Sequence, residues 1–252
     1  MSSFFILERE GAKATVRLNR PERHNALDLA ELPGLTRAVA ELGRDSALRV
    51  LVLTGAGDKS FCAGANLGDV GRGAWRGNPL AVLSAALEAL PVATICALNG
   101  SVYGGGSDLA LACDFRIGVA GMKMRVPPAQ LGVHYYVRGM ERCVALLGLG
   151  LARRIYLTAE SFEDRALHRI GFLDELVPRP AFAARVAEFA AHLAGLAPLA
   201  VAGMKRTLNE IAAGQVDRAR ADRAIIACYE SEDFREGQAA FKEKRPPRFK
   251  GC

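Results

Sequence analysis

Three consecutive glycines at residues 104–106 constrain the fold of this chain more than any other feature. They separate an apolar run with strand character, 92–98, from a run of good helix formers, 109–113. The sequence therefore predicts a buried strand that leads through a glycine turn into a helix. Glycine lets a ligand approach the backbone, and the first N–H groups of a helix have no partner within it. Such a turn can bind an oxygen that becomes anionic, although a turn that serves only close packing fits equally well.

Composition sets the broad class of the protein. The chain has 252 residues and is 50% hydrophobic, which is enough for one large domain or for one domain with a smaller appendage. Its net charge of +6 favours an anionic partner without choosing among phosphate ligands, nucleic acid and membrane. The 6 cysteines form no CxxC pair. With no signal peptide and no long apolar run, this pattern predicts a cytoplasmic protein with reduced cysteines and no metal site.

Strand patterns alternate with helical patterns as far as residue 177, which predicts an α/β layer structure. The expected strands are 4–8, 12–18, 49–54, 92–98, 115–119 and 172–177. Ser161 and Asp164 have the spacing of a capping box, which predicts a helix that starts there. Only helical patterns follow residue 181, so we expect a soft boundary near 178–180. The helical tail then forms a second layer or a surface that packs on another subunit.

Four segments, in order along nearly the whole chain, resemble the enoyl-CoA hydratase/isomerase (crotonase) superfamily. They are the polar loop 19–27, the small-residue segment 61–67, the glycine stretch 99–114 and the tail 236–245. The resemblance implies a crotonase-like (ClpP/crotonase) α/β spiral of strand-strand-helix repeats. It also implies an acyl-CoA-binding core at 1–180, a helical oligomerisation region at 181–252, and assembly as a homotrimer or a dimer of trimers.

The same resemblance assigns roles to individual residues. The backbone N–H groups of Ala65 and Gly105 match the two donors that hold the thioester oxygen of an acyl-CoA. The residues expected to bind CoA or substrate are Arg23, Ala26, Ala63, Gly64, Asn66, Leu67, Gly104, Pro128, His134, Phe241 and Lys244. Phe241 and Lys244 match tail positions that often contact CoA across a subunit boundary. A solvated charge at Lys244 and ordinary packing at His134 are equally open.

The chain departs from the family at the two glutamates that hydratases use to activate water. Asp108 stands at the first position and Pro128 at the second, and a proline cannot exchange a proton. Segments 128–135 and 229–234 resemble the methylmalonyl-CoA decarboxylase branch, which also has a proline there and an active-site tyrosine aligned with Tyr135. That branch has a histidine where this chain has Ala65. We expect Asp108 and Tyr135 to be catalytic, although a buried structural aspartate is an open alternative.

These residues predict an acyl-CoA lyase that works through an enolate. One-carboxylate chemistry of the decarboxylase or lyase type is favoured because of Pro128. The alternatives are a conventional enoyl-CoA hydratase that uses Asp108, or a non-catalytic CoA-binding protein. No cofactor is expected beyond the CoA of the substrate. A membrane is not expected as a partner, because no apolar run is long enough to span a bilayer. A nucleic acid partner is not expected, because the predicted helix 33–42 carries only Arg37 rather than a basic face. Neither the acyl group nor the choice between trimer and hexamer follows from the sequence.

Overall fold

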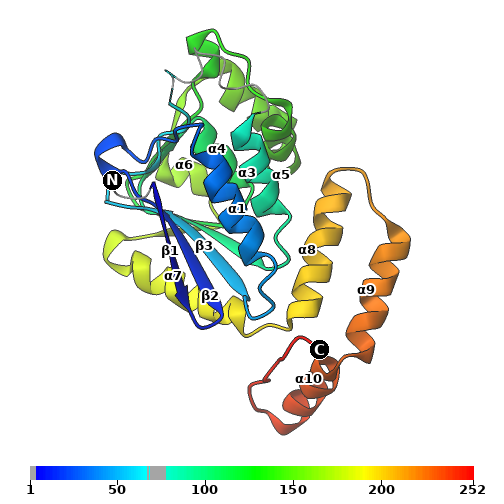
Figure 1. Ribbon diagram of the computed structural model, residues 1–252. Coiled ribbons are helices and arrows are strands. Elements are labelled where there is room, and N and C mark those ends of the chain that lie inside the picture. The colour runs from blue at the N-terminus through cyan, green and yellow to red at the C-terminus, as the bar shows by residue number, and fades with distance from the viewer. Residues whose placement is uncertain (1–3, 67, 69–77) are drawn as a thin grey trace.

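The computed structural model describes residues 4–66, 68 and 78–252 (Figure 1). A six-stranded sheet has the order β1-β2-β3-β5-β7-β10, and all its neighbours are parallel except β1 and β2. Its strands are β1 (Phe5–Glu10), β2 (Lys13–Leu18), β3 (Val50–Gly55), β5 (Ala93–Leu98), β7 (Phe115–Val119) and β10 (Glu175–Val177). The expected strands are confirmed, although the last one is confined to its three final residues.

A second sheet of four short strands lies beside the first, in the order β4-β6-β8-β9. Its strands are β4 (Ser60–Cys62), β6 (Ser101–Tyr103), β8 (Lys123–Arg125) and β9 (Ser161–Glu163). The chain alternates between the sheets, so that β3 and β4 precede α3, β5 and β6 precede α4, and β7 and β8 precede α5. This repetition of strand, strand and helix is the spiral expected from the resemblance.

The helices of the described chain follow this repeat and then continue alone. They are α1 (Leu32–Leu42), α3 (Pro79–Glu88), α4 (Gly105–Leu111), α5 (Val137–Thr158), α6 (Asp164–Arg169), α7 (Arg179–Ala194), α8 (Pro198–Ala212), α9 (Arg218–Glu230) and α10 (Glu232–Glu243). Ser161 does not cap a helix. It pairs with Arg125 in the antiparallel β8–β9 ladder, so the expected capping box is wrong, and α6 begins only at Asp164.

The central strands β3 and β5 of the six-stranded sheet are buried on both faces. Side chains alternate across a strand, so Val50 and Val52 of β3 pack toward α7, while Leu51 and Leu53 join the larger core around α1 and α3. Helix α7 therefore belongs to the layered core. The soft boundary expected near residues 178–180 stays a prediction. The role of the remaining helices in oligomerisation stays a prediction.

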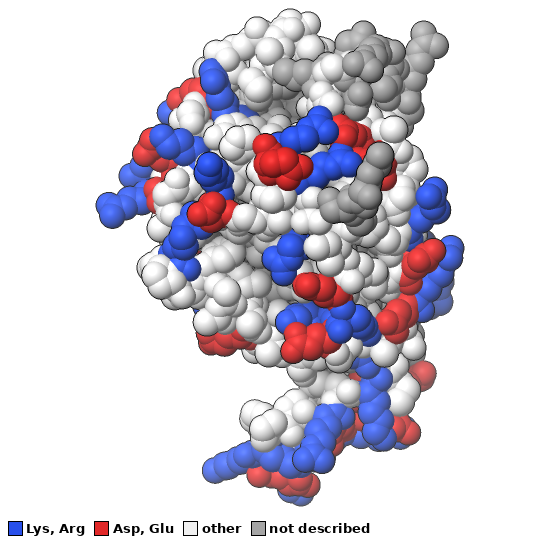
Figure 2. All heavy atoms as spheres, turned by 60° about the vertical axis from the view of Figure 1, so that its left-hand side comes forward, with Lys and Arg blue, Asp and Glu red and all other residues white. Residues whose placement is uncertain are grey.

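Helices α8, α9 and α10 extend from the layered body as an arm (Figure 1). Several large apolar side chains of α8 and α9 are exposed, namely Met204, Leu208, Ile211, Ile225 and Ile226. On the face shown in Figure 2, basic and acidic side chains are intermingled over the body. Within the described residues, no single helix has the length and hydropathy to cross a bilayer; α7 and α8 meet that test only as a pair bent by 102°.

Candidate active site

The small-residue loop 63–66 is fastened to the polar loop 24–27 by backbone hydrogen bonds. Ala63 N donates to His24 O at 2.9 Å, Leu27 N to Gly64 O at 2.8 Å, and Asn66 N to Leu27 O at 2.9 Å. The amide of Ala65 has no acceptor among the described residues. The loop is thus rigidly held, and one N–H group in its middle is left free to bind something else.

The glycine turn brings a second free amide to the same place. Gly104 has φ +50° and ψ −120°, and α4 begins at Gly105, whose N–H has no acceptor in the described chain. A Cβ added at Gly64 would lie 2.9 Å from Gly105 N, and one added at Gly105 would lie 3.8 Å from Ala65 N. Only glycine permits this approach. The structure therefore brings together the two backbone amides that the resemblance pairs.

Asp108 lies in α4, and its side chain is completely buried, at 0% exposure. Its two carboxylate oxygens accept hydrogen bonds from Arg142 Nη1 at 2.8 and 2.9 Å, and Oδ2 also accepts from the Tyr136 hydroxyl. The carboxylate is therefore occupied by internal donors and screened from solvent. This geometry argues against the expected role of Asp108 as the catalytic acid or base, and it favours the alternative of a buried structural aspartate.

Arg142 is the group that holds Asp108 in place. This side chain is only 5% exposed, and its Nη2 also lies 3.2 Å from Glu88 Oε2. Burial alone would lower the pKa of Arg142, but the charges of Asp108 and Glu88 more than offset that effect and raise it. The guanidinium therefore stays charged and ties α5 to α3 and α4. Its sequence signal is weak: Arg142 follows Glu141 at the start of the largely apolar segment 139–149.

Three tyrosines pack beside this ion pair. The rings of Tyr135 and Tyr136 stack at 4.6 Å with an interplanar angle of 21°, and Tyr156 lies 4.9 Å from Tyr135. The Tyr135 hydroxyl donates to Gly104 O at 3.2 Å, directly beside the free amide of Gly105. Burial, followed by the nearby Tyr136 and Asp108, raises the pKa of Tyr135 well above its usual range. Tyr135 is therefore a neutral hydroxyl next to the two amides.

Arg23 and Asn66 lie on the outer side of the loop and meet at Asp28. Asn66 Nδ2 donates to Asp28 Oδ1 at 3.0 Å, and Arg23 Nη1 donates to Asp28 Oδ2 at 3.2 Å. The hydrogen bond from Asn66 is the main cause that lowers the pKa of Asp28, with Arg23 and Arg20 adding to it. Asn66 also accepts from Gly68 N at 3.1 Å.

The other expected binding residues are only partly brought together. Ala26 is half-buried in the fastened loop, and Pro128 is half-buried at the start of a short 3-10 helix, Pro128–Leu131. His134 is exposed, with Nδ1 at 2.6 Å from Tyr135 O. Phe241, which is 88% exposed, and Lys244 lie on or beside α10, at the opposite end of the molecule from α4 (Figure 1). Leu67 lies outside the described residues.

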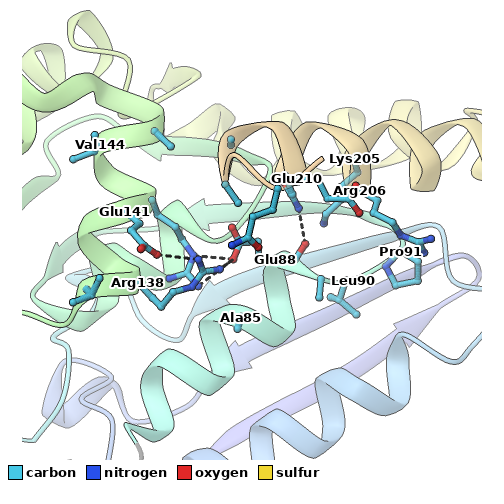
Figure 3. A pocket seen from close by; sticks show the side chains of 18 of the residues that line it. Ala85, Glu88, Leu90, Pro91, Arg138, Glu141, Val144, Lys205, Arg206 and Glu210 are labelled. Atoms are coloured by element: carbon cyan, nitrogen blue, oxygen red, sulfur yellow. Dashed lines mark hydrogen bonds and ion pairs between the residues drawn. The ribbon is translucent and has the colours of Figure 1, made fainter. Parts of the chain in front are cut away.

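The described residues also form a cleft of about 900 Å³ between α3, α5 and α8, which Figure 3 shows from close by. Several of its charged side chains pair with one another: Arg138 lies 2.9 Å from Glu141 and 3.6 Å from Glu88. Of the described residues that the resemblance assigns to CoA, none lines this cleft. It adjoins Arg142 from the side away from Asp108, so it is a feature separate from the pair of free amides.

Comparison with known proteins decides the family. A model of the enoyl-CoA hydratase/isomerase family matches residues 8–252. The chain belongs to this family. Its sequence is 34% identical to a crotonyl-CoA hydratase of Syntrophomonas wolfei, with 97% of this chain and 96% of the relative covered. It is 32% identical to a short-chain-enoyl-CoA hydratase of Clostridium acetobutylicum, with 95% of each chain covered.

Solved structures of the family agree with the fold. An enoyl-CoA hydratase/carnithine racemase from Magnetospirillum magneticum superimposes with a TM-score of 0.93 and 30% identity over 100% of this chain and 97% of that one. An enoyl-CoA hydratase from Bacillus anthracis superimposes with a TM-score of 0.87 and 29% identity, with 99% of this chain and 100% of that chain covered. The expected superfamily and crotonase fold are thus confirmed, and the chain is an enzyme of the enoyl-CoA hydratase/isomerase superfamily that acts on acyl-CoA.

Proposed function

We propose that the amides of Ala65 and Gly105 together hold the thioester oxygen of an acyl-CoA and stabilise the enolate that forms from it. The observation that supports this is the meeting of two free backbone N–H groups between rigidly fastened segments. Such donors are oriented before the substrate arrives, so they stabilise a developing negative charge without reorganisation. Removal of one donor of this kind typically costs about 2.7–4 kcal/mol of transition-state stabilisation.

The reaction we favour is decarboxylation of an acyl-CoA that carries a carboxylate on its α-carbon. In this step the bond between the α-carbon and the carboxylate breaks and CO₂ leaves. The electron pair of that bond becomes the enolate, whose negative charge rests on the thioester oxygen, and the α-carbon then takes a proton from water. No general base is needed. This fits a site in which Asp108 is bound by Arg142 and Pro128 has no proton to exchange.

Hydration of an enoyl-CoA is the second candidate, because the relatives from Syntrophomonas wolfei and Clostridium acetobutylicum are named as hydratases. Addition of water to the β-carbon requires a group that accepts a proton from that water. Asp108 is the carboxylate closest in sequence to the glycine turn, and it would first have to leave Arg142 and Tyr136. The buried ion pair therefore disfavours hydration in this chain.

The two candidates are separated by incubating the purified protein with methylmalonyl-CoA and with crotonyl-CoA. Mass spectrometry of the products detects loss of CO₂ in the first case and gain of water in the second. We expect decarboxylation and slow or absent hydration. Rapid hydration of crotonyl-CoA with no turnover of methylmalonyl-CoA would overturn the decarboxylation proposal. CoA binding without conversion of either thioester would support a non-catalytic protein.

A pair of glycine variants tests the role of the amides. Gly105→Ala adds a Cβ that lies 3.8 Å from Ala65 N and 2.2 Å from Leu80 Cδ2, so the flexible end of the Leu80 side chain has to move. Gly106→Ala, in the same helical turn, is the control for crowding, because its Cβ lies 2.8 Å from Cys62 Cβ and 2.9 Å from Cys62 O in β4. We expect Gly105→Ala to lower kcat by about 10²–10³-fold. Equal losses in both variants, after correction for folded fraction, would contradict the assignment.

A further inference from the structure

The hydroxyl of Tyr135 donates to the carbonyl oxygen of Gly104 at 3.2 Å. That oxygen and the N–H of Gly105 belong to the same peptide group. We propose that Tyr135 is a positioning residue, which orients and polarises the 104–105 peptide so that its N–H is aimed at the substrate oxygen. This inference rests on the proposed function and extends it from the two amides to the side chain that controls one of them.

The peptide needs such control because it lies between two glycines. Gly104 has φ +50° and ψ −120°, a conformation that side chains disfavour, and a glycine can leave it at little cost. Rotation of the 104–105 peptide would turn the Gly105 N–H away from the amide of Ala65. The carbonyl of Gly104 accepts from Ser107 N at 3.0 Å within the first turn of the helix, and the Tyr135 hydroxyl is a second, external anchor.

The hydrogen bond also changes the strength of the donor. When a carbonyl accepts a hydrogen bond, electron density moves toward its oxygen and the N–H of the same peptide becomes a better donor. This cooperative effect is on the order of 10–30% per bond in condensed phases. The Tyr135 hydroxyl therefore acts on the substrate oxygen through the peptide, without touching the substrate.

The surroundings keep Tyr135 in this position. Its ring stacks on Tyr136, whose hydroxyl is bound to the buried Asp108, and it leans on Tyr156. A Cβ added at Gly139 would lie 2.6 Å from Tyr135 Cε1, so the absence of a side chain there makes room for the ring. Since burial raises the pKa of Tyr135, the hydroxyl keeps the proton that it donates.

A matched pair of variants isolates the hydrogen bond. Tyr135→Phe keeps the ring and removes the donor to Gly104. Tyr156→Phe removes an equivalent bond, from a tyrosine hydroxyl to the carbonyl of Gly139 at 3.2 Å, in the same ring cluster. The readouts are kcat and KM for methylmalonyl-CoA, and the infrared stretching frequency of the thioester carbonyl of bound acetyl-CoA labelled with ¹³C at that carbon.

We expect the wild-type protein to lower the carbonyl frequency of bound acetyl-CoA relative to free acetyl-CoA. Tyr135→Phe should lose part of this shift and about fivefold in kcat, the typical effect of one hydrogen bond, with KM little changed. Tyr156→Phe should keep the full shift. Replacement of Tyr135 by a fluorinated tyrosine, whose O–H is a stronger donor, should increase the shift.

Two results would overturn this inference alone: an unchanged shift in Tyr135→Phe, or an equal loss in Tyr156→Phe, which would indicate a merely structural role for the ring cluster. If Tyr135→Phe does not fold, the variant with fluorinated tyrosine at position 135 tests the inference instead. An unchanged carbonyl frequency of bound acetyl-CoA in that variant would contradict polarisation through the peptide. Absence of any shift in the wild-type protein would instead overturn the proposed function, so the two failures are distinguishable.

Discussion

Asp108 and Asp114 lie close together in the sequence, in α4 and just after it, and each pairs with a cation from a later helix. Asp108 accepts from Arg142 of α5 at 2.8 and 2.9 Å, and Asp114 accepts from Lys205 of α8 at 2.8 Å. Their other partners differ. Asp108 is bound by the hydroxyl of Tyr136, whereas Asp114 is bound by the backbone N–H and the hydroxyl of Thr94, at 2.7 and 2.8 Å.

The difference shows what each ion pair supports. Asp114 links α8 to the start of β5, with its side chain 23% exposed, so water still reaches it. Asp108 is shielded from water and supports the tyrosine ring beside the glycine turn. A carboxylate near a glycine turn is thus not a catalytic group merely because of its position. The hydrogen bonds that its oxygens accept, and the access of solvent to them, decide whether it can exchange a proton with a substrate.

The largest expected effect follows from removing the cation at the shielded pair. Arg142→Leu leaves Asp108 buried without its counter-charge, and such a loss typically destabilises a protein by about 3–5 kcal/mol. Urea denaturation measures the change in the free energy of unfolding. The double variant Arg142→Leu with Asp108→Asn should recover part of it. A cost below about 1 kcal/mol would show that the pair is not the clamp described.

A smaller effect is expected at the second pair. Lys205→Met removes a cation that donates to Asp114 and to Val92 O at 2.9 Å. Asp114 keeps both hydrogen bonds from Thr94 and some contact with water, so the cost should be about 1–3 kcal/mol. The same denaturation experiment measures it. If Lys205→Met lowered the free energy of unfolding more than Arg142→Leu does, the account of the two ion pairs would be contradicted.

Alkaline pH should affect only the tyrosine-bearing region. Burial is the first cause that raises the pKa of Tyr135, Tyr136 and Tyr156. A group whose pKa is raised on folding contributes its full stability below its unfolded pKa, about 10 for tyrosine, and loses it as the pH rises further. Protection of the backbone amides against hydrogen exchange should therefore be lost above about pH 10 in α4 and the first turns of α5 before it is lost in α8. Simultaneous opening of both regions would contradict this.

The smallest expected effect is on turnover. Asp108→Asn should lower the rate of methylmalonyl-CoA decarboxylation by less than about tenfold, since Asp108 transfers no proton in the proposed reaction; a general acid or base contributes about 10²–10⁴-fold. Asp114→Asn is the control for general loss of stability. A drop in kcat of more than about 100-fold in Asp108→Asn alone, with the protein folded, would restore Asp108 as the acid or base.

The strands of the six-stranded sheet could be predicted from local sequence patterns. The apolar runs that form β3, β5 and β7 are long enough to show strand character, and residues 104–106 correctly mark the start of α4. The second sheet was beyond prediction because β4, β6, β8 and β9 have three residues each, too few for a periodic signal. Ser161 illustrates the limit, because its pairing with Arg125 overrides the local preference for a helix cap.

Only the backbone groups of the candidate site could be predicted from the sequence. The pairing of the amides of Ala65 and Gly105 follows from the resemblance to the enoyl-CoA hydratase/isomerase family, whereas the small residues at 63–65 and 104–106 by themselves indicate only that the backbone can be closely approached there. The sequence does not show that the carboxylate of Asp108 accepts hydrogen bonds from Arg142 and Tyr136, because these residues lie more than 25 residues away in the chain, in a helix and a loop. Tertiary packing alone brings them to it.

A crystal structure with acetyl-CoA bound would test the central claim most directly. The account predicts that the thioester oxygen lies about 2.7–3.1 Å from both Ala65 N and Gly105 N, with Asp108 still bound to Arg142 and no carboxylate beside the acyl group. A thioester oxygen bound elsewhere, or Asp108 released from Arg142 and turned toward the acyl chain, would contradict it.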